Sequence, residues 1–288
     1  MSYAYFPGCS QQGMAAEFDR SARSVCDRLG IALSEIPDWV CCGATPAHAT
    51  SHLLSIALPA LTLAKVKDAD AVATVCAACY SRLRIASHEL REDAELRARV
   101  KEAAGVECAG EVPVRHLLDI LCNDLGVAAI RERVKRPLAG LKVACYYGCL
   151  LMRPPKVVAF DDPENPRVMD EVLAAAGAEC VEWPYKTECC GASLSLARPD
   201  VVCKLANDIL REARDAGAHV IAVACPLCHT NLDLRQADVA RQYGVRYEMP
   251  VLFFTQLLGL ALGVPEKGLG LNRLIVSPKP VLEKLAAA

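Results

Sequence analysis

Short apolar runs alternate along the chain with stretches in which apolar residues recur at helical spacing. The runs 141–147 and 220–224 are largely apolar, which predicts buried strands. Segments 15–29 and 201–213 place their apolar side chains on one stripe, as an amphipathic helix does. Strands that alternate with helices indicate an α/β fold with mainly parallel sheets.

The longest apolar run, 251–264, is shorter than the roughly 20 residues that a membrane-spanning helix needs. We expect it to form a helix in the core. The first residues lack the charged and apolar regions of a signal peptide. We therefore expect a cytoplasmic protein that is associated with a membrane only through its partners.

The second half of the chain repeats the first, because six landmarks recur in the same order at similar offsets. Such a repeat indicates that one unit was duplicated, and a Pro/Gly break at 136–140 separates the copies. We predict an N-terminal domain, 1–138, and a C-terminal domain, 139–288, as two pseudo-symmetric Rossmann-like α/β domains. The matched segments are 5–9 with 145–149, 30–35 with 177–182, 41–43 with 189–191, 72–79 with 221–228, 80–83 with 229–232, and 112–114 with 249–251.

Ten of the sixteen cysteines belong to this repeat. Each half supplies one cysteine, then an adjacent pair followed by glycine, then a C-x-x-C. Parallel sheets place ligand sites at the carboxyl ends of their strands, and the single cysteine and the C-x-x-C both follow predicted strands. We therefore expect one site in each half. The two sets are Cys9, Cys41, Cys42, Cys76 and Cys79, and Cys149, Cys189, Cys190, Cys225 and Cys228.

Four or five thiolates at one site select zinc, copper(I) or an iron–sulfur cluster. Structural zinc takes four ligands, so zinc leaves a fifth cysteine without a role and is the less favoured metal. An adjacent pair suits a cluster, because neighbouring side chains can reach different iron atoms. We expect Gly43 and Gly191, which follow the pairs, to adopt positive φ. Each C-x-x-C is expected to begin a helix, whose positive end lowers the pKa of a thiol.

The other six cysteines are interpreted as packing residues, because free cysteine is a common small side chain of protein cores. Cys145 stands four residues before Cys149, but its counterpart in the repeat is Tyr5, which favours a place in the core over a ligand role. Disulfides are not expected in a cytoplasmic chain of this length. The remaining five are Cys26, Cys108, Cys122, Cys180 and Cys203.

Charge and motifs exclude some partners. The formal net charge of −2 gives no reason to expect nucleic acid. The chain has neither a G-x-G-x-x-G motif nor a P-loop, so we do not expect it to bind a nucleotide.

The doubled motif Cys9…Cys41-Cys42-Gly43…Cys76-x-x-Cys79 and its second copy resemble the duplicated cysteine-rich "CCG" domain. Nearly the whole length resembles the B subunit of heterodisulfide reductase and the B-type subunits of bacterial sulfur-oxidising complexes. The resemblance implies that each set holds a noncubane [4Fe–4S] cluster. It also implies that a disulfide is reduced, or thiols are oxidised, between the two clusters.

The same resemblance implies two partner subunits. A ferredoxin-like iron–sulfur C-type subunit is expected to exchange electrons with the clusters, and a flavin-containing A-type subunit is expected beyond it. The substrate is expected to be a disulfide or a thiol, with a protein-bound lipoyl group as one candidate.

Two further residues are candidates for catalysis. His229 directly follows the second C-x-x-C and is predicted to deliver a proton or to bond a sulfur; a helix-capping role is the alternative. Arg153 lies in a proline-rich run, 151–155, that the first half lacks, and it begins the longer stretch 153–166. It is predicted to steer an anionic substrate, with an exposed loop position as the alternative. The stretch itself is expected to cover the second site or to form an interaction surface.

Three other functions stay open. In the first, the chain is an electron-transfer or scaffold subunit of a flavoprotein complex of the glycolate, lactate or glycerol-3-phosphate type. In the second, zinc stabilises a binding protein. In the third, a thioredoxin-like dithiol lies at 225–228, although this leaves Cys149, Cys189 and Cys190 without a role.

Overall fold

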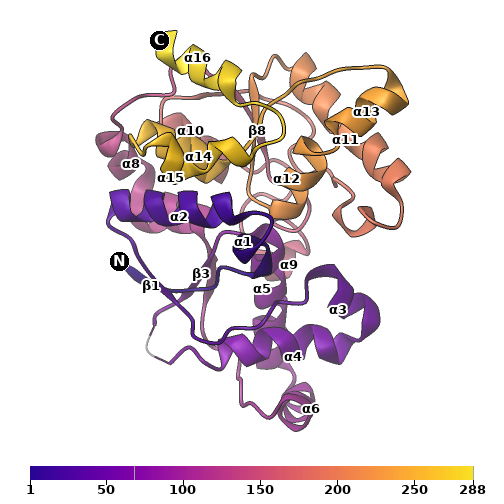
Figure 1. Ribbon diagram of the computed structural model, residues 1–288. Coiled ribbons are helices and arrows are strands. Elements are labelled where there is room, and N and C mark those ends of the chain that lie inside the picture. The colour runs from indigo at the N-terminus through magenta and orange to yellow at the C-terminus, as the bar shows by residue number, and fades with distance from the viewer. Residues whose placement is uncertain (68, 288) are drawn as a thin grey trace.

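The computed structural model, which describes residues 1–67 and 69–287, contains one four-stranded sheet in each half (Figure 1). All strand pairs are parallel. The order β2-β1-β3-β4 in the first sheet recurs as β6-β5-β7-β8 in the second. The α/β fold class expected from the sequence is therefore confirmed. The strands are β1 Ser2–Tyr5, β2 Ala32–Glu35, β3 Val72–Thr74, β4 Val114–His116, β5 Lys142–Tyr146, β6 Glu179–Cys180, β7 Val220–Val223 and β8 Val251–Phe253.

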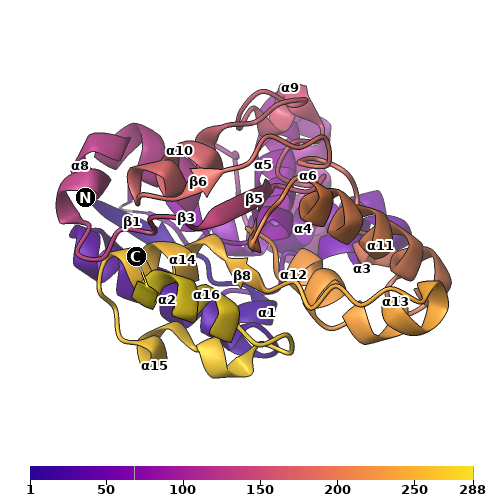
Figure 2. The same cartoon turned by 90° about the horizontal axis from the view of Figure 1, so that it is seen from above.

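Helices connect the strands and cover the two sheets. Figure 2 shows α11, α12 and α13 together at one end of the molecule. In the first half the helices are α1 Cys9–Gln12, α2 Ala16–Leu29, α3 Ala44–Thr50, α4 His52–Leu63, α5 Ala77–Glu92, α6 Ala94–Ala104, α7 Leu117–Asp119, a π-helical segment Ile120–Gly126, and α8 Val127–Arg133. In the second half they are α9 Pro155–Val158, α10 Val168–Ala175, α11 Pro199–Asp215, α12 Pro226–Asp233, α13 Gln236–Tyr243, α14 Phe254–Ala261, α15 Glu266–Leu269 and α16 Lys279–Ala287, with 3₁₀ turns at Ala192–Leu194 and Leu271–Arg273.

The helices predicted at 15–29 and 201–213 are α2 and α11 of the structure. The strands predicted at 141–147 and 220–224 are β5 and β7. The expectation for 251–264 is partly wrong. Its first three residues form β8, which pairs with β7, and the helix α14 begins only at Phe254. The whole run is buried except for a few side chains, and an all-apolar run carries no period that separates a strand from a helix.

The two halves share one hydrophobic core. Helix α2 of the first half packs against α14 of the second (Figures 1 and 2), where the rings of Phe18 and Phe253 stack with centroids 3.9 Å apart. Beside them, Ser21 and Thr255 share a hydrogen bond of 2.6 Å. The segment 136–140 lies between α8 and β5, and the division into domains 1–138 and 139–288 stays a prediction.

In the described ranges, none of the helices combines the length and the apolar character that crossing a bilayer requires.

Candidate functional site

The first five cysteines form a continuous row of thiols. The Sγ atoms of Cys9 and Cys41 lie 3.4 Å apart, and those of Cys42 and Cys79 lie 3.6 Å apart. Cys41 also lies close enough to Cys42, and Cys76 to Cys79, for each to shift the pKa of its neighbour. Cys9 is exposed, whereas Cys42, Cys76 and Cys79 are buried. The row therefore runs from the surface into the core.

The second five repeat this arrangement. The Sγ atoms of Cys149 and Cys189 lie 3.8 Å apart, and those of Cys190 and Cys228 lie 3.5 Å apart. Cys225 and Cys228 lie close enough to shift each other's pKa. Cys189 is the exposed member, and Cys190, Cys225 and Cys228 are buried. The site residues that the repeat assigns to each half are thus close together in space.

The two rows meet at their buried ends. The thiols of Cys76 and Cys225 lie close enough for each to shift the pKa of the other. Their strands, β3 and β7, end there, and the amide of Ala77 donates to the carbonyl of Ala224 at 3.0 Å. All ten thiols therefore form one contiguous group that crosses the boundary between the two sheets.

Glycines make room for the thiols. Gly8 has φ 83°, and a Cβ placed on it would lie 2.8 Å from the Sγ of Cys79. Gly148 occupies the same place in the second half, with φ 67° and only 3.2 Å to the Sγ of Cys228. Gly43 and Gly191, at φ 79° and 75°, adopt the positive φ expected of them.

Hydrogen bonds from neighbouring thiols and backbone amides favour thiolate at several positions. The thiol of Cys149, together with the amides of Gly191 and Ala192, lowers the pKa of Cys189 to about 6. Bonds from Cys228 and Cys76 lower the pKa of Cys225 well below its usual value. Five converging sulfurs with amide donors around them fit a group that binds thiolates through several metal atoms. They exceed the four ligands of a structural zinc site.

A family model for the CCG cysteine-rich domain matches residues 3–84 and again residues 143–233. Each match contains one complete cysteine set. The chain belongs to the CCG cysteine-rich domain family. The paired cysteine sets of this CCG protein are consistent with iron–sulfur binding.

Several CCG relatives match almost end to end. The chain is 34% identical over 276 residues to the 8-methylmenaquinol:fumarate reductase membrane anchor subunit of Wolinella succinogenes, covering 95% of this chain and 96% of the relative. It is 32% identical over 288 residues to the B subunit of the ferredoxin:CoB-CoM heterodisulfide reductase of Methanosarcina mazei, covering 97% and 95%. A hypothetical protein from Helicobacter pylori shares the fold, with a TM-score of 0.76 at 14% identity over 96% of this chain and 52% of that one.

His229 directly follows the second cysteine set in the sequence, but its side chain contacts other residues. Its Nε2 atom lies 3.0 Å from the carbonyl oxygen of Val251, and its ring stacks on Phe253 with centroids 4.4 Å apart. Burial lowers the pKa of this imidazole to about 4. It is therefore neutral near pH 7, and these contacts disfavour the predicted proton delivery.

The side chain of Arg153 donates hydrogen bonds to residues of its own loop. Its guanidinium donates to the carbonyl of Pro163 at 2.8 Å and to the carboxylate of Glu164 at 2.7 Å. These contacts favour the loop role over steering of a substrate. The stretch 153–166 crosses to the first half, where Tyr80 and Arg84 of α5 donate to the carbonyls of Val158 and Val157.

One matched pair of polar residues beside the thiols was not among the predicted site residues. Asn231 donates to the carbonyl of Cys190 at 2.9 Å and approaches its Sγ at 3.7 Å. Its counterpart is Arg82, whose half-buried guanidinium interacts electrostatically with Cys42. Both residues stand three positions after their C-x-x-C, and this shared position is the signal that could have identified them.

A second difference between the halves is Gln11. Its side chain is 3% exposed, and within the described part of the chain neither amide atom has a hydrogen-bond partner. A Cβ placed on Gly8 would lie 2.8 Å from the Sγ of Cys79 and 3.4 Å from the Oε1 of Gln11. The amide of Gln11 is therefore close to this thiol. Buried amides are rarely left unpaired. Leu151 stands two residues after Cys149, as Gln11 does after Cys9, so only the first set has this unpaired amide.

We expect Gly8→Ala to lower the metal content of the first site, because the new methyl group meets the Sγ of Cys79. The measurement is metal per chain after anaerobic purification. Gly126→Ala is the matched control: its φ of 83° and ψ of 141° are close to the 83° and 160° of Gly8, so the backbone cost of about 1–3 kcal/mol is similar, but nothing lies within 4 Å of the new methyl. Equal metal content in the two variants would contradict the expectation.

Proposed function

We propose that the chain is the iron–sulfur catalytic subunit of a heterodisulfide reductase-like complex. It would reduce a disulfide, or oxidise thiols, at two noncubane [4Fe–4S] clusters held by the ten cysteines of the two sets. When bound, the clusters would supply one-electron transfer to the substrate sulfurs. The observation that carries the proposal is the contact between Cys76 and Cys225, which brings two five-thiol sites together.

Two adjoining sites suit a disulfide, because its cleavage takes two electrons and each site would pass one. The exposed thiols of Cys9 and Cys189 leave each set open on one side, while the other sides are buried. The cysteines of this CCG protein would thus hold the metal, and backbone amides would donate hydrogen bonds to the cysteine sulfurs. The buried ends of the two cysteine rows would exclude water.

The proposal includes partner subunits. We infer that a ferredoxin-like iron–sulfur subunit delivers or removes electrons and that a flavin-containing subunit lies beyond it, as a complex of this kind requires. A membrane would be reached through such partners.

Anaerobic purification followed by metal analysis tests the cofactor. About eight iron atoms per chain with matching sulfide are expected for two [4Fe–4S] clusters. Stoichiometric zinc without iron would overturn the proposal. Turnover is then tested with reduced viologen as electron donor and a panel of disulfides: the CoB–CoM heterodisulfide, a lipoyl domain and oxidised glutathione.

A second candidate function is favoured by the relative from Wolinella succinogenes, which is named as the membrane anchor subunit of a fumarate reductase. In this case the chain relays electrons or anchors a neighbouring subunit that performs the chemistry. Full iron content without turnover of any disulfide or thiol would support this candidate over the first.

We expect the first site to have the higher reduction potential, because Arg82 stabilises an added electron whereas Asn231 is neutral. A charge that stabilises the added electron by about 1 kcal/mol raises a one-electron potential by about 40 mV. Arg82 is half-buried, so Arg82→Asn should lower one midpoint potential by a few tens of millivolts. A redox titration followed by electron paramagnetic resonance measures it. Arg91→Asn, an exposed charge on the same helix, should leave both potentials unchanged, and equal shifts in both variants would contradict the assignment.

A further inference from the structure

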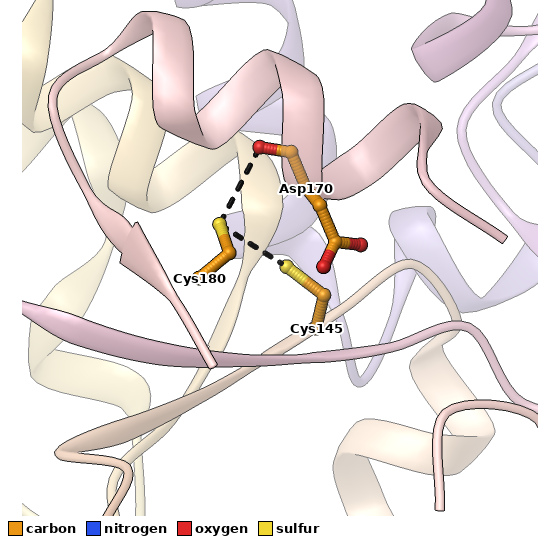
Figure 3. Close-up of side chains that lie close together, drawn as sticks. All are labelled: Cys145, Asp170 and Cys180. Atoms are coloured by element: carbon orange, nitrogen blue, oxygen red, sulfur yellow. Dashed lines mark hydrogen bonds between the residues drawn. The ribbon is translucent and has the colours of Figure 1, made fainter. Parts of the chain in front are cut away.

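Two cysteines outside the ten-thiol group face each other in the second half. The Sγ atoms of Cys145 and Cys180 lie 3.8 Å apart, and Figure 3 shows the two side chains pointing toward one another. They come from adjacent strands, because Val143 of β5 is the register partner of Cys180 and Cys145 lies two residues further along the same face. Helix α10 covers the pair and contributes Asp170 (Figure 3).

The surroundings of the pair are charged and buried. One carboxylate oxygen of Asp170 accepts a hydrogen bond of 2.9 Å from the ammonium of Lys186. The other accepts one of 2.5 Å from the hydroxyl of Tyr147. Lys186 is 3% exposed and also donates to the carbonyl of Pro166 at 3.2 Å. The thiol of Cys180 donates to the backbone carbonyl of Asp170 at 3.4 Å.

A metal ion fits these neighbours poorly. Cys145, Cys180 and Asp170 offer three ligand atoms within 4.8 Å of one another, whereas structural zinc takes four protein ligands. Both carboxylate oxygens of Asp170 are already bonded, and the ammonium of Lys186 repels a cation at this position. The same ammonium lowers the pKa of Cys145, but burial, the neighbouring thiol of Cys180 and the carboxylate of Asp170 raise it further, so Cys145 rests as a thiol.

We propose that Cys145 and Cys180 are a redox-active dithiol that a low-molecular-weight disulfide converts to an intramolecular disulfide bond. The two sulfurs have to close from 3.8 Å to the bonded S–S distance of about 2.05 Å, and because the residues are diagonal neighbours on β5 and β6 this includes a shift of the strand backbones. Disulfides in reducing compartments are usually transient and redox-sensing or catalytic. The proposal does not depend on the proposed function, because it involves none of the ten cysteines.

Exposure sets the order of the steps. Cys180 is half-buried and Cys145 is fully buried, so Cys180 loses its proton to solvent and attacks one sulfur of RSSR, forming Cys180–S–S–R as RS⁻ leaves. Cys145 then gives its proton to the RS⁻ released in the first step, against the burial that raises its own pKa. Its thiolate attacks the Cys180 sulfur, and the second RS⁻ leaves. Two protein thiols are oxidised, one disulfide is reduced to two thiols, and the two protons end on the RS⁻ groups.

The dithiol is mechanically tied to the second cysteine set. The carbonyl of Lys186 accepts the amides of Tyr147 at 2.8 Å and Gly148 at 3.1 Å, immediately before Cys149. If oxidation moves Lys186, which is paired with Asp170, these two bonds transmit the movement to the turn at Gly148 that precedes Cys149.

The test uses the anaerobically purified holoprotein in glutathione buffers of increasing oxidised fraction, followed by alkylation, tryptic digestion and mass spectrometry. We expect peptide 143–156 joined to peptide 168–186, two hydrogen masses lighter than the separate thiols, in a fraction that rises with oxidised glutathione while the iron content stays constant. Cys145→Ser should leave Cys180 as a mixed disulfide with glutathione and abolish the link. Cys180→Ser should leave Cys145 reduced.

Two results would overturn the proposal. One is a protein in which Cys145 and Cys180 remain separately alkylatable at every glutathione ratio. The other is zinc that co-purifies with the wild-type protein at one atom per chain and is lost in Cys180→Ser, because the pair would then be a metal site. The half-buried Cys122, which has no thiol partner among the described residues, is the internal control and should form no intramolecular link.

Discussion

Cys225→Ala should remove the iron of the second site and reduce disulfide turnover by more than the roughly 10–100-fold that is typical for residues that only support a ligand. Cys225 lies beside Cys228 of its own set and Cys76 of the other, and both lower its pKa. Its loss therefore breaks the second set and the contact between the two. Iron per chain should fall to about half, and the spectrum of the remaining cluster should change.

The measurement combines iron and sulfide analysis, electron paramagnetic resonance and turnover with an artificial donor. Cys76→Ala is the companion variant and should remove the first cluster instead. Cys26→Ala is the matched control, because Cys26 is equally buried at 1% exposure but lies on α2 among apolar side chains. Full iron content and two unchanged signals in Cys225→Ala would contradict the proposed ligand set.

Lys186→Met should lower stability by about 3–5 kcal/mol, because it leaves the carboxylate of Asp170 buried without its cation. The ion pair is 2.9 Å long, and its side chains are only 4% and 14% exposed. Thermal unfolding of the holoprotein should show a midpoint lower by several degrees. The double variant Lys186→Met with Asp170→Leu removes both charges and should recover most of the loss.

Lys204→Met provides a control with the same geometry in water. Its Nζ also lies 2.9 Å from a carboxylate, that of Asp208, but the lysine side chain is 66% exposed. Surface pairs of this kind contribute about 0–1 kcal/mol. If the two lysine variants unfold at the same temperature, then burial does not decide the contribution of Lys186.

The two halves are alike in fold and different in chemistry. Both use the same strand order and the same positions for the five cysteines. Around these positions the first half places Arg82 and the unpaired Gln11, and the second places Asn231 and Leu151. A duplicated unit thus supplies two similar sites, and the side chains around them would set which site takes the first electron.

The amino-acid sequence determined the features that depend on local pattern and on the repeat. Buried runs and amphipathic stripes predict parallel α/β halves, and the repeat assigns five cysteines to each. Positive φ at Gly43 and Gly191 also follows from local pattern, because the turn after each cysteine pair favours a residue without Cβ. The apolar run at 251–264 could not be divided in this way, since strand pairing with β7 rather than periodicity decides where β8 ends.

Only the tertiary structure decided which distant groups meet. Successive residues on a helix point about 100° apart, so His229 turns toward Val251 although it follows Cys228 directly. The contact of Cys76 with Cys225 and the pairing of Cys145 with Cys180 join segments that are far apart in the chain. The first contact arises where two sheets pack on one core and the second from strand pairing within one sheet, and no spacing in the sequence encodes the distance between their thiols.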